Sequence, residues 1–178
     1  IRDSEEEHQR KPRLKLSAPW RRPKSLGDFE LEGGRLNAKD PEIFSKDPVN
    51  FLRMFHVAQE NDLEFHPQIL KLVNQDLKLI DKKLRHDQEA NSLFLEILTS
   101  KKGPERILRR MNEAQVFGRF IPDFGKVVAQ MQYDMYHVYT VDEHTIIMLG
   151  MLFKIEKREL EEIAPTASSV VGKVISRR

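Results

Sequence analysis

The sequence of 178 residues contains no cysteine. This absence excludes disulfides, thiolate metal ligands and a cysteine nucleophile, and it favours a reducing compartment, so we expect a cytoplasmic protein. The sequence also lacks any apolar run near the ~20 residues of a membrane-spanning helix. Its longest run, residues 146–153, is interrupted only by Gly150 and predicts a buried helix. No signal peptide is visible at the start, so we expect no membrane partner.

The sequence shows little excess of charge of either sign, since 30 lysines and arginines stand against 28 aspartates and glutamates. A net charge of +2 gives no indication of nucleic acid as a partner. The exception is the stretch 10–24, which holds seven basic residues, three prolines and Trp20 but no acidic residue. We interpret residues 1–27 as a basic, proline-broken linker. The alternative is an arm that contacts phosphates or an acidic partner.

One β-hairpin is predicted close to the N-terminus. Residues 29–38, FELEGGRLNA, alternate apolar and polar residues on both sides of Gly33-Gly34, and two glycines supply the positive φ of a tight hairpin turn. The pattern that follows is helical to the end of the sequence. The predicted fold class is therefore mostly α: a multi-helix bundle with one small β-hairpin near the N-terminus.

Seven helices are predicted from apolar spacing and from residues that start or stop a helix. Their starts are Asp47-Pro48, His66-Pro67, Asp87, Gly103-Pro104, Pro122-Asp123, Thr140 and about Thr166. The second is predicted to continue to residue 84, because apolar residues recur at steps of three and four: Leu70, Val73, Leu77, Ile80 and Leu84. The fifth is predicted to face inward with four apolar residues: Phe124, Val127, Val128 and Met131.

The helix at Thr140 opens with a group of polar residues. Thr140 and Glu143 fit a capping box, in which the threonine oxygen accepts the Glu143 amide and the carboxylate returns to Thr140. This places His144 in the first turn, where it can serve as a structural residue or as one ligand of a divalent metal. A metal site needs three or more protein ligands. The local candidates are His137, Asp142 and Glu143, and no H-E-x-x-H spacing is present, so the spacing alone favours the structural role.

No other catalytic motif is complete in this sequence. No two aspartates are separated by a single residue, as the metal-binding pair of a nucleotidyl transferase would require. No Walker loop or dinucleotide-binding glycine pattern occurs. A serine triad can be written from Ser92, His86 and Asp81, but nothing in their context sets them apart from residues on a helix surface.

Two long runs, residues 47–81 and 91–146, carry a family resemblance. They resemble the bacterial bifunctional uridylyltransferase/uridylyl-removing enzyme of nitrogen regulation, and the resemblance extends over about residues 28–165. It implies a parent enzyme that uses UTP to attach UMP to the signalling protein PII, and that removes it, according to the glutamine level. Magnesium or manganese is the implied cofactor. The implied domain order is transferase, helical linking domain, metal-dependent phosphohydrolase and regulatory domains.

Mapped onto this chain, the resemblance implies a helical linking domain with an N-terminal hairpin at 28–132 and a truncated start of the phosphohydrolase at 133–178. His144 matches the first histidine of the hydrolase metal site, but the histidine–aspartate doublet that should follow it is missing, since no histidine follows His144. We therefore expect no bound metal, no activity of the chain alone, and self-association through its apolar helix or through the face of Val170 to Ile175. Two positions depart from the family pattern: Gln115 replaces a usual glycine, and Val138 replaces a frequent histidine or arginine.

The predicted function is that of an inactive fragment of this PII-modifying enzyme, in which the helical region joins the transferase and hydrolase domains. One alternative is a stand-alone helical interaction module whose basic arm binds an acidic partner. A second alternative is the helical domain of an RNA-end-adding nucleotidyltransferase, which would bind RNA.

Overall fold

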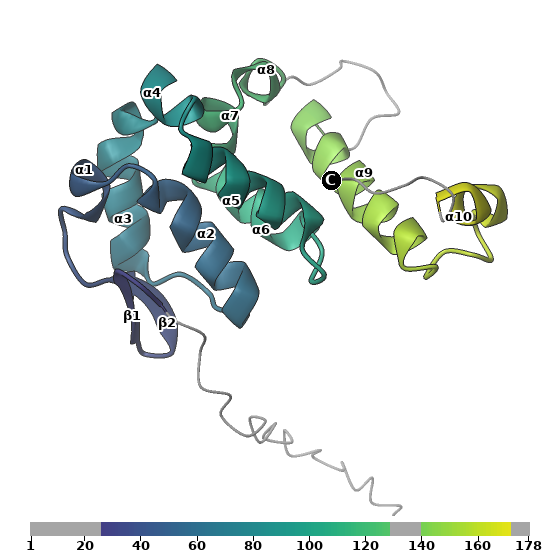
Figure 1. Ribbon diagram of the computed structural model, residues 1–178, viewed down its shortest axis with the longest axis horizontal. Helices are drawn as coiled ribbons and strands as arrows, with labels where there is room; N and C mark the ends of the chain where they lie inside the picture. Colours follow the sequence, from purple (N-terminus) through teal and green to yellow (C-terminus); the bar gives the residue numbers. More distant parts are fainter. Residues whose placement is uncertain (1–25, 129–139, 172–178) are drawn as a thin grey trace, which may run out of the picture.

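The computed structural model describes residues 26–128 and 140–171 (Figure 1). It is mostly helical with one two-stranded antiparallel sheet near the N-terminus, which confirms the predicted fold class. The strands are β1 (Phe29–Glu32) and β2 (Arg35–Ala38). The helices are α1 (Ile43–Lys46), α2 (Asn50–Asn61), α3 (Pro67–Asp76), α4 (Lys82–Arg85), α5 (Gln88–Thr99), α6 (Glu105–Glu113), α7 (Val116–Phe120), α8 (Pro122–Gly125), α9 (Val141–Glu156) and α10 (Pro165–Val171). The predicted linker 1–27 lies outside the described residues apart from its last two.

The hairpin forms as predicted. Phe29 pairs with Ala38 at its open end, and Gly33 and Gly34 adopt φ values of 57° and 77° at the turn. Positive φ at both positions is the geometry that a two-residue turn needs to match the twist of its strands. The hairpin is held to the rest of the fold by Leu36, whose amide donates to the Glu64 carbonyl at 2.8 Å and whose carbonyl accepts the His66 amide at 2.9 Å.

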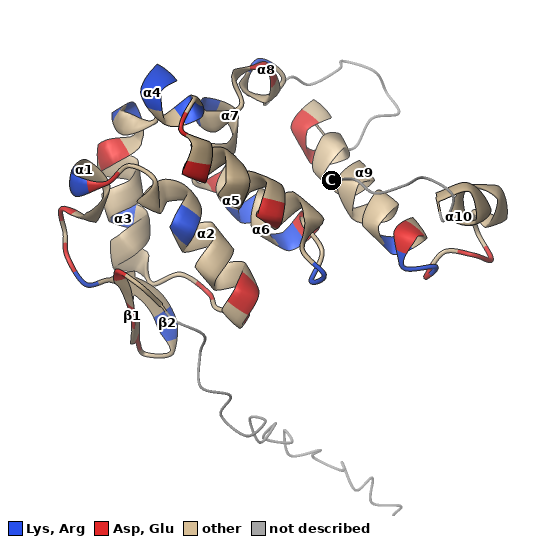
Figure 2. Cartoon of the chain, in the orientation of Figure 1, with Lys and Arg blue, Asp and Glu red and all other residues tan. Residues whose placement is uncertain are grey.

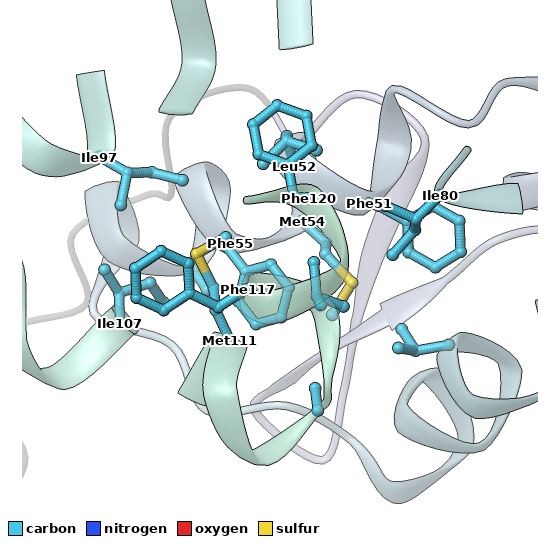
Figure 3. Packing of buried hydrophobic residues seen from close by; sticks show 14 of the residues in the cluster. Phe51, Leu52, Met54, Phe55, Ile80, Ile97, Ile107, Met111, Phe117 and Phe120 are labelled. Atoms are coloured by element: carbon cyan, nitrogen blue, oxygen red, sulfur yellow. The ribbon is translucent and has the colours of Figure 1, made fainter. Parts of the chain in front are cut away.

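The hydrophobic core is centred on α2. Figure 3 shows its side chains surrounded by apolar residues from α5, α6 and α7. Phe55 packs edge-on against Phe65, with ring centroids 5.2 Å apart. Burying each large apolar side chain contributes roughly 1.5–3 kcal/mol. Five residues of α2 have no exposed surface: Phe51, Leu52, Met54, Phe55 and Ala58.

Several predicted helix starts are confirmed by the contacts that cap them. The Asp87 carboxylate accepts the Ala90 amide at 2.9 Å and caps α5. His66 caps α3, because its Nδ1 accepts the Gln68 amide at 3.2 Å ahead of Pro67. α10 begins one residue before the predicted start. At α2 the Asp47 carboxylate accepts the Val49 amide at 3.1 Å, so that Asp47 forms a turn ahead of a helix that begins at residue 50.

The prediction of one continuous helix from residue 66 to 84 is wrong. The chain forms α3, a 3-10 turn at Leu77–Leu79 and the separate short helix α4. Asp81 is extended, with φ −101° and ψ −171°, and its carboxylate accepts the Leu84 amide at 3.0 Å. The apolar spacing still marks burial from Val73 onward, because the chain bends around the core it contacts. Leu70 is only partly buried.

The predicted long helix after Pro122 is also wrong. α8 ends at Gly125, Phe124 is buried and Val128 is exposed, while Met131 lies outside the described residues. The short helix α7 before it was not predicted. α7 and α8 meet at Gly118 and Gly125, where a Cβ added to Gly125 would lie 2.4 Å from the Gly118 carbonyl oxygen. This close approach leaves no room for a side chain at either glycine, so that only glycine allows α7 and α8 to meet there.

Gln115 lies between α6 and α7 in the left-handed region, with φ 59° and ψ 13°. Its side chain is exposed. A non-glycine residue in this region is strained by about 1–2 kcal/mol, which gives a physical reason for the glycine expected at this position from the resemblance.

Gln115→Gly is expected to raise the free energy of unfolding by about 1 kcal/mol, because relief of the strain exceeds the added entropy of the unfolded chain. Urea unfolding followed by circular dichroism measures the change. Gln115→Ala, which keeps the Cβ, should give no comparable gain. A Gln115→Gly variant less stable than the parent chain would contradict the assignment of strain.

Candidate functional site

Helix α9 carries His144, and its first turn is built differently from the predicted capping box. Thr140 is extended and its carbonyl accepts the His144 amide at 3.0 Å, but its side chain makes no capping hydrogen bond. The Glu143 carboxylate instead pairs with Arg109 of α6 at 3.2 Å. The predicted capping box is therefore wrong, because an ion pair to another helix takes the carboxylate that the box needs.

Asp142 is directed toward α6 as well. Its carboxylate accepts a hydrogen bond from Asn112 Nδ2 at 2.7 Å, and the residue is only 5% exposed. A buried carboxylate is costly unless it is hydrogen-bonded, so this contact restrains where the first turn of α9 can lie. Asn112 is one turn of α6 beyond Arg109, and the two side chains hold neighbouring residues of α9.

Two close approaches continue the contact toward the other end of α9. A Cβ added to Gly150 would lie 2.3 Å from Glu105 Oε2, and one added to Gly103 would lie 3.1 Å from the Phe153 ring. We call the four contacts 112–142, 109–143, 105–150 and 103–153 the α6–α9 interface. Residue numbers fall along one side as they rise along the other, so α6 and α9 run antiparallel.

His144 lies on the opposite face of α9. Residues 142, 146 and 150 are buried, whereas the His144 side chain is exposed. Within residues 26–128 and 140–171, no group of three or more histidine, aspartate or glutamate side chains could hold a metal ion. The described residues therefore do not make up a metal site. The local alternative, a site formed by His137 with Asp142 or Glu143, is weakened because Asp142 and Glu143 contact α6. His137 itself lies outside the described residues.

The face of α9 that carries His144 is apolar beyond its first turn. Met148, Met151 and Leu152 are 57%, 48% and 51% exposed. Figure 2 shows that charged residues of α9 occur only near its two ends. The prediction that the run 146–153 is buried is thus wrong for these three residues, which form an exposed apolar patch in the described part of the chain. None of the helices described there combines the length and apolar character that a bilayer crossing needs.

A groove of about 470 Å³ lies along the α6–α9 interface, and basic residues line much of it. Their charge is largely matched: Lys102 pairs with Asp62, and Arg110 pairs with Glu64 and Glu113 at 2.9 and 3.0 Å. The hydrogen bond to Glu113, together with Glu64, raises the pKa of Arg110 above its ordinary value. This pairing leaves little positive charge to hold an anion in the groove.

The serine triad written from the sequence is not assembled. Asp81 caps α4, His86 Nδ1 lies 2.7 Å from the Lys82 carbonyl oxygen, and Ser92 Oγ contacts Glu96 at 3.5 Å. Each residue serves its own local contact.

The α6 side of the interface was not predicted from the sequence. Glu105, Arg109 and Asn112 recur at i, i+4 and i+7 and therefore share one face of α6. The same spacing is typical of a solvent-facing stripe, so it could not show that another helix packs there. The buried glycine at 150 was a second signal, since glycine within an apolar helix often marks a close approach.

A family model described as the uridylyltransferase GlnD third domain matches residues 29–120, from β1 to the end of α7. The chain belongs to this family. The predicted family resemblance is thereby confirmed. The match ends before α9, so His144 lies beyond the third-domain match. The division into 1–27, 28–132 and 133–178 stays a prediction.

Three relatives each carry the name bifunctional uridylyltransferase/uridylyl-removing enzyme. The one from Azospirillum brasilense is 54% identical over 177 residues, 98% of this chain and 19% of that protein. That from Novosphingobium aromaticivorans is 55% identical over 157 residues, 88% and 17% of the two chains. That from Rhodospirillum rubrum is 47% identical over 174 residues, 98% and 18%. The chain thus spans less than a fifth of these relatives. No solved structure matches it.

Titration of the 178-residue chain with Mn²⁺ is expected to show no micromolar binding, because one imidazole binds a divalent metal far more weakly than a completed set of ligands does. Isothermal calorimetry measures this, and His144→Ala should give the same result as the unchanged chain. Micromolar binding that disappears in His137→Ala would contradict the expectation and would establish a local site with Asp142 or Glu143.

Proposed function

We propose that this chain is a segment of a bifunctional enzyme that uses UTP to attach UMP to the signalling protein PII, and removes it, in response to glutamine. The observation that carries the proposal is the 54% identity over 177 residues to a relative with both activities in its name. The third-domain match supports a place for this segment inside the longer protein. The proposed location is the cytoplasm, with no nucleic acid or membrane as partner.

Within that protein, the proposed role of the segment is to join and orient the transferase and hydrolase domains. Packing of α9 on α6 supports this role, since the interface connects the third-domain match to the helix that carries His144. The stand-alone interaction module and the RNA-end-adding enzyme are less well supported, because the relatives carry neither description.

His144 is proposed as the first ligand of a divalent metal, magnesium or manganese, in the hydrolase part. An exposed imidazole on a helix whose other face is fixed supports this role. The remaining ligands would come from outside the described residues. The chain alone is therefore proposed neither to add UMP to PII nor to remove it.

A chimera tests the proposal: this chain replaces the matching 177 residues of the Azospirillum brasilense relative. The chimera is expected to add a uridylyl group to PII with UTP and to remove it, as followed by the mass of PII. His144→Ala in the chimera should lower removal by at least a hundredfold and leave addition within about twofold, since a lost metal ligand disables one site.

The 178-residue chain alone serves as the control and should change the mass of PII in neither direction. Removal that persists in the His144→Ala chimera would contradict the role of His144. A folded chimera that modifies other substrates but never PII would contradict the proposed function itself.

Self-association is also proposed, because the exposed apolar face of α9 lies open in the described part of the chain and such patches promote contacts. Light scattering behind a sizing column is expected to show a dimer or larger species at high concentration. Leu152→Glu should shift it to the monomer. The matched control is Leu95→Glu on α5, where the leucine is 58% exposed. This variant should associate to the same extent as the unchanged chain. A clean monomer of the unchanged chain would refute the proposal.

A further inference from the structure

Helix α9 is oriented in an unusual way for a helix at a protein surface. Its acidic first turn contacts α6, whereas several large apolar residues face outward: Met148, Met151 and Leu152. An ordinary surface helix buries its apolar stripe and exposes its polar one. Apolar packing alone therefore does not account for the rotation of α9 about its axis.

Polar contacts from α6 restrict that rotation, together with Ile146, which has no exposed surface and belongs to the core. Asn112 Nδ2 donates to Asp142 at 2.7 Å, and Arg109 lies 3.2 Å from Glu143. Rotating α9 by one residue position would separate both pairs and leave the Asp142 carboxylate buried away from its amide partner, which is costly.

Close contacts between a glycine and a side chain restrict the position of α9 along its axis. Gly150 faces Glu105 and Gly103 faces the Phe153 ring, each at a distance that leaves no room for a Cβ without displacement. Sliding α9 by one turn would bring a larger side chain against Glu105. Together the polar and steric contacts favour the observed rotation and axial position.

We propose that Asn112 and Arg109 of α6 are positioning residues for His144. They hold the first turn of α9 so that the imidazole is presented away from the third domain, toward the side where its partners would approach. Asn112 contributes more than Arg109 to holding the first turn of α9, because its partner Asp142 is buried. The Arg109–Glu143 pair is partly exposed and correspondingly weaker. The functional consequence rests on the proposed function of His144; the positioning itself does not.

The first test uses the 178-residue chain and needs no activity. Asn112→Asp sets two carboxylates against each other at the interface, and α9 amides are expected to exchange with deuterium roughly ten- to hundredfold faster, as the loss of a hydrogen bond to a charged group implies. Amides of α2 should keep their protection. Asn74→Asp, the same change at an exposed position on α3, is the matched control and should alter neither helix.

The double variant with Asn112→Asp and Asp142→Asn exchanges the amide and the carboxylate across the interface, and it should restore most of the protection of α9. A general loss of structure would not be repaired in this way. Unchanged protection in Asn112→Asp, or no recovery in the double variant, would overturn the inference.

The second test uses the chimera with the Azospirillum brasilense relative. Asn112→Asp should lower uridylyl removal at least tenfold with addition within about twofold, and the double variant should recover removal. Arg109→Gln should lower removal less, and Arg110→Gln, whose guanidinium pairs with Glu64 and Glu113, should not lower it. If His144→Ala keeps removal, the proposed function of His144 fails. If His144→Ala loses removal but Asn112→Asp keeps it, the positioning inference alone is overturned.

Discussion

Burial of α2 is the constraint on which the rest of the structure depends. Every residue of this helix is buried or partly buried, and apolar side chains from the surrounding helices pack on it from several directions. A helix enclosed in this way cannot be moved without opening cavities, which cost several kcal/mol for each large side chain lost from contact. The helices around it therefore have little freedom, and α6, which contacts α2, is among them.

A buried amide connects this core to the outer helices. Gln59 of α2 donates from Nε2 to the carbonyls of Ile97 and Gly103, at 3.1 and 2.9 Å. Gly103 adopts φ 81° and lies against the Phe153 ring of α9. Since a buried carbonyl without a donor is costly, the loop before α6 is held in place. The contacts thus run without interruption from the core through this loop to α9.

The two faces of α9 have opposite character, and this fits a helix placed between two bodies. Toward α6 it makes specific polar contacts, and Ile146 is buried in the core on the same face, so that this side defines the orientation. Its apolar face can contribute stability through burial, once a partner covers it. Orientation from one side and stability from the other is a suitable arrangement for a segment proposed to join two domains.

Local signals explain why much of the fold could be predicted. The turn at Gly33-Gly34 and the cap at Asp87 involve contacts between residues only a few positions apart. The local sequence is therefore enough to predict them. The apolar spacing of α2, α5 and α6 likewise reports burial within each helix. The family could be identified because long runs of residues matched its pattern.

The failures share a physical cause. α3 ends at Asp76, where the chain bends through Leu77–Leu79 over the core it contacts, and α8 ends at Gly125, which lies against Gly118. The capping box at Thr140 does not form, and Glu143 pairs instead with Arg109, which lies 34 positions away in the sequence.

By itself, then, the sequence determined the helical class, the hairpin, the family and the place of His144 in a first helical turn. Only the tertiary structure decided which way that turn faces. The spacing of Glu105, Arg109 and Asn112 is the same whether their side chains meet water or another helix, and only the packing of α6 on the core brings them to Asp142 and Glu143.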